Sequence, residues 1–369
     1  MLEVLQELVS MPSYSGQERK IQEHIKKQLE SSGVEPFFQG DNLIVHLPGK
    51  DQTRAFIFNS HVDVVDVGDE SKWTHSPWSG DIKNGRIYGR GTSDMKGGVY
   101  ASMETAKALA GKDKLPCDVW FTYVAREEVD GSGTKEFREW FEKEGYRNRY
   151  REIAAVFTEP TSLSFAEYGH RGNFFIKASI DGDTGHSARP TLIKKHAILE
   201  MIGLLNDLPK ESARWARKFG GGEFTPPTIT VTAIDAQSAS PNKVSDHCEA
   251  SLDLRTIPTF HQEAFERIRI LADRRGINLS LVFPDAPAGY TDPNSRIIKI
   301  LKHLVPDLKL AVSQGSADLG FLTTIGVEGV IFGPGDQNQS HTINESASID
   351  QILAAPALYE KLYLAWAKE

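Results

Sequence analysis

The chain has 369 residues, of which 40% are hydrophobic and 25% are charged, and it carries a formal net charge of -8. This composition is typical of an ordinary globular protein and excludes disordered and fibrous classes. The negative charge, with Lys and Arg scattered along the chain, argues against nucleic acid as a partner.

The N-terminal region predicts two amphipathic helices and no targeting segment. Apolar residues recur at helical spacing over residues 2–9 and 18–29. Ser15 and Glu18 have the spacing of a capping box at the start of the second helix. The N-terminus lacks a basic region, and no apolar run approaches the ~20 residues that span a bilayer. With only two cysteines in the chain, these features predict a cytoplasmic protein without a membrane partner.

Short apolar runs then alternate with helical stretches, which indicates an α/β domain with a largely parallel sheet. Buried parallel strands appear in a sequence as continuous apolar runs bounded by turns. The predicted strands cover residues 43–47, 55–59, 119–125, 153–158 and 329–332, and the predicted helices cover 99–109 and 135–143.

The pattern changes between residues 168 and 283, where it predicts a smaller α+β insert. Its predicted strands are 174–180, 228–233 and 249–255, and its predicted helices are 194–208 and 262–274. Because 369 residues exceed the usual size of one domain, we expect two. The larger, mostly parallel domain is then discontinuous and comprises residues 1–167 and 284–369.

Four predicted strands end just before groups that bind metals. Ligands in open α/β sheets bind beyond the carboxyl ends of the strands, so these groups are expected to converge on one crevice. They are His61 and Asp63, Glu127 and Glu128, Glu159, and His341, with Asp94 in a glycine-containing loop between the first two sets.

The residue types indicate a site for two metal ions. Two histidines and three carboxylates, with no cysteine, suit a pair of Zn²⁺ or similar ions. His61 and Asp63 share a face of an extended chain, so Asp63 is expected to accept the second imidazole N–H and to orient the ring. Adjacent Glu127 and Glu128 point in different directions, so one can bind metal while the other accepts a proton from water. A phosphate loop is excluded because Asp94 stands at the third glycine of GxGxxG.

Eight segments across nearly the whole chain share the pattern of a known family. They are SHVDVV (60–65), GRGTSDMKGG (89–98), REEVDGSGT (126–134), TEPT (158–161), GHSARP (185–190), PNKV (241–244), DLR (253–255) and QNQSHTINE (337–345). In order and spacing the chain resembles the zinc hydrolases that include aminoacylase, acetylornithine deacetylase, succinyl-diaminopimelate desuccinylase and carboxypeptidase G.

This resemblance assigns roles to the metal-binding groups. It implies Glu127 as general base and a cis peptide bond between Asp94 and Met95. It also implies a bridged pair of Zn²⁺ ions, with Co²⁺ or Mn²⁺ as alternatives, whose ligands are His61, Asp94 and Glu159 for one ion and Asp94, Glu128 and His341 for the other.

The resemblance also implies that the insert is a lid and dimerisation domain. In that reading His186 reaches a neighbouring subunit's active site and stabilises the oxyanion, while Asn242 and Arg255 hold the substrate carboxylate. A guanidinium group suits this task because it grips carboxylates bidentately. Taken without the resemblance, His186 is a solvated loop histidine and Arg255 is an ion-pair partner on a strand face.

Three functions follow from these expectations. The first is a dizinc amidohydrolase that cleaves an amide bond next to a carboxylate, as an N-acyl-amino-acid deacylase of the acetylornithine deacetylase or succinyl-diaminopimelate desuccinylase type. Glu159, where some relatives carry Asp, favours deacylases and carboxypeptidases over aminoacylase-like dipeptidases. The second is a metallo-carboxypeptidase or dipeptidase, acting on a small peptide. The third is a non-catalytic metal-binding scaffold, which is disfavoured because Glu127 accompanies all five ligands. We further expect a homodimer that forms through the insert.

Overall fold

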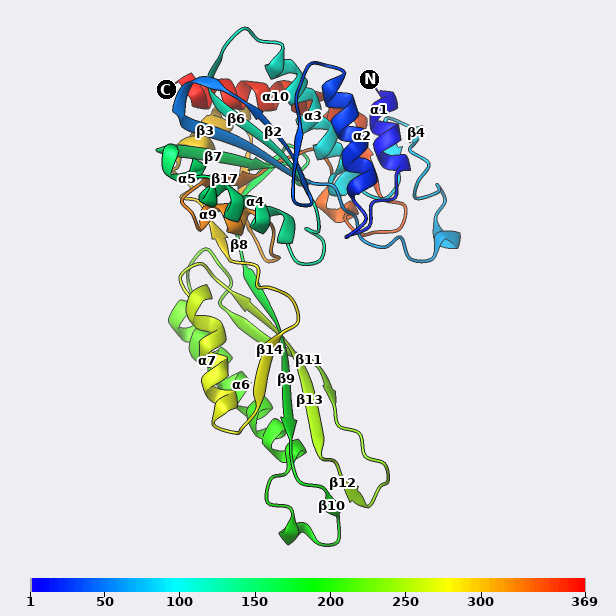
Figure 1. Cartoon of the computed structure of the whole chain (residues 1–369), viewed down its shortest axis with the longest axis vertical. Coiled ribbons are helices and arrows are strands. Elements are labelled where there is room, and N and C mark those ends of the chain that lie inside the picture. Colours follow the sequence, from blue (N-terminus) through cyan, green and yellow to red (C-terminus); the bar gives the residue numbers. More distant parts are fainter. Residues whose placement is uncertain (1, 369) are drawn as a thin grey trace. The chain divides into compact units, whose positions relative to one another are not determined.

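The computed structural model describes residues 2–368, which form two compact units. The first unit comprises the described residues up to Gly169, the segment Tyr290–Ala311, and the described residues from Ala317 onward. The second comprises His170–Gly289 and Val312–Ser316. Figure 1 shows the elements of both units along the chain.

The first unit is built on a nine-stranded sheet whose central strands are parallel. Strands β6, β3, β7 and β17 lie side by side in this order and run in the same direction, whereas β2 pairs antiparallel with β6 and β8 pairs antiparallel with β17. The predicted α/β class with a parallel core is therefore confirmed. The strands are β1 (Phe37–Gln39), β2 (Asn42–Leu47), β3 (Gly49–His61), β6 (Leu115–Val124), β7 (Glu152–Phe157), β8 (Phe165–His170), β15 (Gly289–Tyr290), β16 (Lys309–Ser313) and β17 (Glu328–Ile331).

Helices cover both faces of this sheet, which explains why its strands are continuously apolar. Along β3, the rings of Phe56 and Phe58 pack against Trp366 and Tyr359 of α10 at 5.5 and 5.4 Å between centroids. The alternate residue Ile57 belongs to the core on the other face, with residues of α4 and α9. The helices are α1 (Leu2–Ser10), α2 (Arg19–Glu30), α3 (Gly97–Ala110), α4 (Ser132–Lys143), α5 (Tyr146–Arg149), α8 (Arg296–Leu304), α9 (Leu319–Thr323) and α10 (Ile349–Lys368).

A small three-stranded sheet completes the first unit. Its strands are β4 (Asp81–Lys83), β5 (Arg86–Tyr88) and β18 (Ser346–Ser348), and β5 pairs antiparallel with both others. This pairing connects the segment before Asp94 with the segment after His341. Two of the predicted metal-binding loops are thus attached to one sheet.

The predicted capping box at the start of α2 is wrong. Glu18 precedes the helix, but no side chain caps its N-terminus. The Glu18 carboxylate instead accepts hydrogen bonds from the backbone N–H of Gly16 at 2.8 Å and from that of Arg126 at 3.1 Å. A local helix signal is overridden because Glu18 holds the loop that follows β6.

The second unit is an antiparallel sheet with two helices on one face. The strand order is β11–β13–β9–β14, and alternate residues such as Ile176 of β9 and Leu252 of β13 form a core with α6 and α7. The elements are β9 (Gly172–Asp181), β10 (Gly185–His186), β11 (Thr228–Asp235), β12 (Lys243–Val244), β13 (His247–Thr256), β14 (Asn278–Leu281), α6 (Ala197–Phe219) and α7 (His261–Asp273).

Helix α6 extends well beyond the predicted end at residue 208. It continues through Pro209, although a proline inside a helix removes one backbone hydrogen bond. The extension buries Trp215, whose ring lies 5.1 Å from that of Phe260, and places Phe219 at 4.9 Å from the same ring. Aromatic packing therefore stabilises the added turns. Among the described helices, none has the length and apolar character needed to cross a membrane.

Candidate metal centre

The predicted metal-binding residues of the first unit lie at the carboxyl ends of its parallel strands. His61 is the last residue of β3, and Glu127, Glu159 and His341 lie in the segments that follow β6, β7 and β17. Because parallel strands present these ends at one edge, residues far apart in the sequence come together there. Asp94 joins them from the segment η2 (Thr92–Lys96), immediately before α3.

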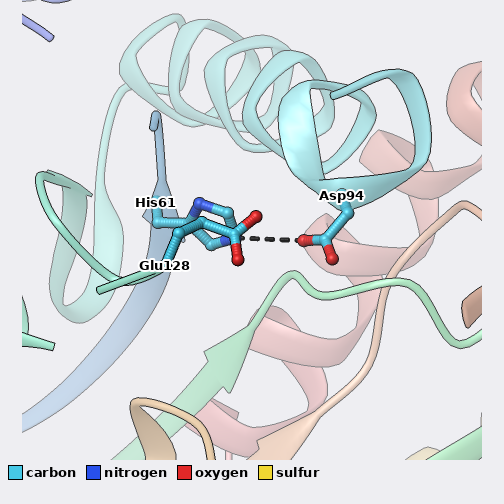
Figure 2. Close-up of side chains that lie close together, drawn as sticks. All are labelled: His61, Asp94 and Glu128. Atoms are coloured by element: carbon cyan, nitrogen blue, oxygen red, sulfur yellow. Dashed lines mark hydrogen bonds and ion pairs between the residues drawn. The ribbon is translucent and has the colours of Figure 1, made fainter. Parts of the chain in front are cut away.

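His61 is the buried centre of this group, with 1% of its surface exposed. Its Nε2 lies 3.1 Å from Asp94 Oδ1 and 3.5 Å from Glu159 Oε1. Figure 2 shows the imidazole facing the Asp94 carboxylate, with Glu128 beside it. On the other side of the ring, Nδ1 donates to the backbone oxygen of Asp63 at 3.0 Å. This bond places the proton on Nδ1 and leaves the lone pair of Nε2 free to bind a metal.

The Asp63 carboxylate is farther from the ring than its own backbone oxygen, with Oδ1 at 3.4 Å from Nδ1. It accepts a hydrogen bond from Ser15 Oγ at 2.6 Å and one from each backbone N–H of Glu127 and Glu128, both at 3.1 Å. Asp63 therefore orients the ring of His61 with its backbone oxygen and fixes the backbone of both glutamates with its carboxylate. This second task did not follow from the sequence, because it depends on a contact between separate loops.

Asp94 faces a different imidazole with each of its carboxylate oxygens. Oδ1 faces His61, and Oδ2 lies 3.5 Å from His341 Nε2. The same His341 nitrogen is 2.9 Å from Glu128 Oε2. This arrangement suits a carboxylate that binds two ions at once. The peptide bond between Asp94 and Met95 is cis, as the resemblance implies.

The donor atoms fit a pair of borderline divalent ions. Ligand atoms of His61, Asp94 and Glu128 lie within 4.8 Å of one another, and so do those of His61, Glu127 and Glu159. All are imidazole nitrogens or carboxylate oxygens, the donors that Zn²⁺, Co²⁺ and Mn²⁺ accept. The same five residues, with His341, were singled out by the sequence pattern.

Burial raises the pKa values of the glutamates in this group and of Asp318. Burial raises the pKa of Glu127 well above its usual range, in part through the nearby negative charge of Asp318. Burial likewise raises the pKa of Glu159 to about 7 and that of Asp318 to about 7. Two divalent cations would offset this crowded negative charge.

Sequence reasoning missed Asp318 as a member of this environment. Its carboxylate is 3% exposed and accepts a 2.6 Å hydrogen bond from Thr134 Oγ1, which in turn accepts from Asn59 Nδ2. A charged residue immediately before the apolar helix α9 was the one available signal.

The remaining predicted residues belong to the second unit. His186 Nε2 lies 3.3 Å from Asn242 Nδ2, and strand β10, which carries His186, pairs with β12. Arg255 Nε lies 2.9 Å from Asp253 Oδ1, and its Nη2 donates to Asp253 Oδ2 at 3.1 Å. His186 and Asn242 are thus neighbours, whereas Arg255 forms an ion pair on its strand.

Comparisons with known proteins show similarity to one family of peptidases and related hydrolases. The model of peptidase family M20/M25/M40 matches residues 57–365. A succinyl-diaminopimelate desuccinylase of Cereibacter sphaeroides is 28% identical over 342 residues, which cover 87% of this chain and 86% of the relative. The structure is also similar to that of an M20 family metallo-carboxypeptidase from Sulfolobus solfataricus, with a TM-score of 0.76, 20% identity and coverage of 99% of both chains. A dinuclear metal binding M20 peptidase of Bacillus subtilis gives a TM-score of 0.73 at 15% identity, covering 98% of this chain and 96% of that one.

Proposed function

Because the chain belongs to peptidase family M20/M25/M40 and is a metal-dependent hydrolase, we propose that it cleaves an amide bond next to a carboxylate. The reaction is removal of an acyl group from an N-acyl amino acid, of the acetylornithine deacetylase or succinyl-diaminopimelate desuccinylase type. One observation carries the two-metal assignment: the two oxygens of Asp94 face two different imidazoles. The desuccinylase named among the relatives supports the deacylase reading.

The ions proposed are two Zn²⁺, with Co²⁺ or Mn²⁺ as alternatives. When bound, such ions polarise a carbonyl group and acidify water. The residues that would hold one ion are His61, Asp94 and Glu159, and those that would hold the other are Asp94, Glu128 and His341.

Glu127 is the proposed general base and acid. It belongs to the same cluster as His61 and Glu159, and the Asp63 carboxylate holds its backbone N–H at 3.1 Å. Because its backbone is held in place, the Glu127 side chain is positioned to accept a proton from the attacking water and to return it to the departing amine. A non-catalytic scaffold has no use for such a group, and this speaks against that alternative.

The second unit is proposed as a lid and dimerisation domain. Its strand β11 lies at the edge of the four-stranded sheet, and Val231 and Ile234 on it are 39% and 51% exposed. An exposed edge strand with apolar side chains favours pairing with a second copy of the chain. In that dimer His186 would stabilise the oxyanion in the partner's site, and Asn242 and Arg255 would bind the substrate carboxylate.

A substrate panel tests the proposed function. We expect N-acetyl and N-succinyl amino acids to be hydrolysed and unmodified dipeptides to be poor substrates. Chelator treatment should abolish the activity, and added Zn²⁺ or Co²⁺ should restore it. Faster cleavage of dipeptides would instead assign the chain to the peptidases. Full activity in protein shown by metal analysis to contain no transition metal would reject the two-metal mechanism.

Arg255→Ala is expected to lower kcat/KM for a carboxylate substrate because a charge-assisted contact is lost. The loss of transition-state stabilisation should be about 1.5–3 kcal/mol. Substrates amidated at that carboxylate should be poor for the wild type and no worse for the variant. Arg275→Ala is a matched control, since Arg275 pairs with Asp207 at 2.8 Å in the same unit. Equal turnover of the acid and its amide by the wild type would reject this role.

A further inference from the structure

A buried carboxylate outside the proposed ligand set organises the loop that carries Asp94. Glu345 has no exposed surface and accepts four hydrogen bonds. On Oε2 the donors are Arg90 Nη1 at 2.8 Å and the backbone N–H of Gly91 at 3.0 Å. On Oε1 they are the backbone N–H groups of Ser93 at 2.8 Å and Asp94 at 3.1 Å. The last donor belongs to the residue proposed to bridge the metals.

The loop is shaped to receive this carboxylate. Three backbone N–H groups within residues 91–94 converge on it, and such converging amides form an anion-binding nest. Gly91 has a φ of 83°, and a Cβ at this position would lie 2.7 Å from Val64 Cγ1. The turn therefore requires glycine, and the backbone conformation of the turn directs these amides toward the Glu345 carboxylate.

Glu345 also belongs to the segment that carries His341. Its backbone oxygen accepts from Gly89 N–H at 3.0 Å, and Arg90 Nη1 donates to the Thr342 backbone oxygen at 3.2 Å. A separate link joins the same two segments, because Ser93 Oγ donates to the Asp336 backbone oxygen at 2.9 Å. The segments of Asp94 and His341 are thus attached to each other at several points, with the Glu345 carboxylate at the centre.

We propose that Glu345 is a positioning residue that sets the separation of Asp94 and His341 and thereby the metal affinity of the ion they share. Asp94 Oδ2 and His341 Nε2 lie 3.5 Å apart on the two segments that Glu345 joins. The inference rests on the ligand assignment of the proposed function. Glu345 itself binds neither metal nor substrate in this scheme.

Glu345→Gln removes the charge with little change in shape. One carboxylate oxygen becomes an NH₂ group, which faces two N–H donors instead of accepting from them. Whichever oxygen is replaced, at least one backbone donor of the loop loses its partner in a buried place. We expect the affinity for one of the two ions to fall by about 10- to 100-fold, the usual effect of removing a partner that orients metal ligands.

The experiment compares Zn²⁺ binding by the wild type, Glu345→Gln and Asp118→Asn, with a chelator as competitor, together with thermal unfolding of each metal-free protein. Asp118 is a matched control, because it is also fully buried and accepts from Gly49 N–H at 2.8 Å and Tyr150 OH at 2.6 Å. It lies near the beginning of β6, whereas the candidate site lies beyond the end of that strand. Both variants should be destabilised, but only Glu345→Gln should bind Zn²⁺ more weakly.

Ser93→Ala serves as a milder second variant if Glu345→Gln does not fold, because it removes the hydroxyl link to Asp336 alone. It should also weaken Zn²⁺ binding, by less than Glu345→Gln. Unchanged affinity in the variants that fold, or an equal loss in Asp118→Asn, would overturn the positioning role. If the wild type bound none of Zn²⁺, Co²⁺ and Mn²⁺, the proposed function itself would be refuted, so the two failures are distinguishable.

Discussion

Replacing Glu127 with Gln is expected to lower kcat by about 10²- to 10⁴-fold, the range that general acid–base catalysis contributes. The amide has the shape of the carboxylate but cannot accept the proton of the attacking water. The backbone N–H of Glu127 remains bound to Asp63 Oδ1 at 3.1 Å, so the new side chain should start from the same position. Metal content, measured by elemental analysis after dialysis, should equal that of the wild type.

Glu128→Gln is the matched control, since it places the same chemical change on the adjacent residue. Glu128 Oε2 lies 2.9 Å from His341 Nε2, and it is proposed as a ligand. We expect this variant to lose metal, and its activity to recover in part when excess Zn²⁺ is supplied. Near-wild-type kcat in Glu127→Gln would show that another group accepts the proton. Loss of metal from Glu127→Gln would place Glu127 among the ligands.

The parallel core of the sheet could be predicted from the sequence because strands buried on both faces appear there as continuous apolar runs. Strands β2, β7 and β17 begin and end within one residue of the predicted apolar runs. Strand β3 is longer than predicted, since it begins at Gly49, in a polar stretch that pairs with β6 near Leu115 and Cys117. Polar residues at the start of a strand carry no hydrophobic signal, so the pairing alone defines this end.

The convergence of the metal-binding groups was also predictable, because strand order and strand direction place carboxyl ends together. The hydrogen bonds that hold these groups in place could not be predicted. Ser15, Glu18 and Glu345 act through contacts with residues between 48 and 255 positions away in the sequence. Each is an ordinary polar residue within its own segment. Only the folded chain shows that the Ser15 hydroxyl binds Asp63 and that Glu345 binds the loop of Asp94.

The role of the second unit is tested by mixing two inactive variants, His186→Ala and Glu127→Gln. If the chain is a dimer in which His186 completes the partner's site, a hybrid dimer contains one site with both groups intact and one with neither. With random exchange at equal amounts, about half of the dimers are hybrids and half of their sites are whole, so about a quarter of the wild-type activity should return.

This result depends on the histidine acting in the partner's site. If His186 served its own chain, or if the protein were a monomer, every site in the mixture would still lack one group, and no activity would return. Asn242→Ala is a useful companion to His186→Ala, because Asn242 lies 3.3 Å from the imidazole and its loss should be complemented by the same Glu127→Gln subunits if both residues act across the interface. Native mass spectrometry must show that hybrids form. Hybrids without activity would remove His186 of the neighbouring subunit from the mechanism and leave Glu127 and the metal ligands as the catalytic groups.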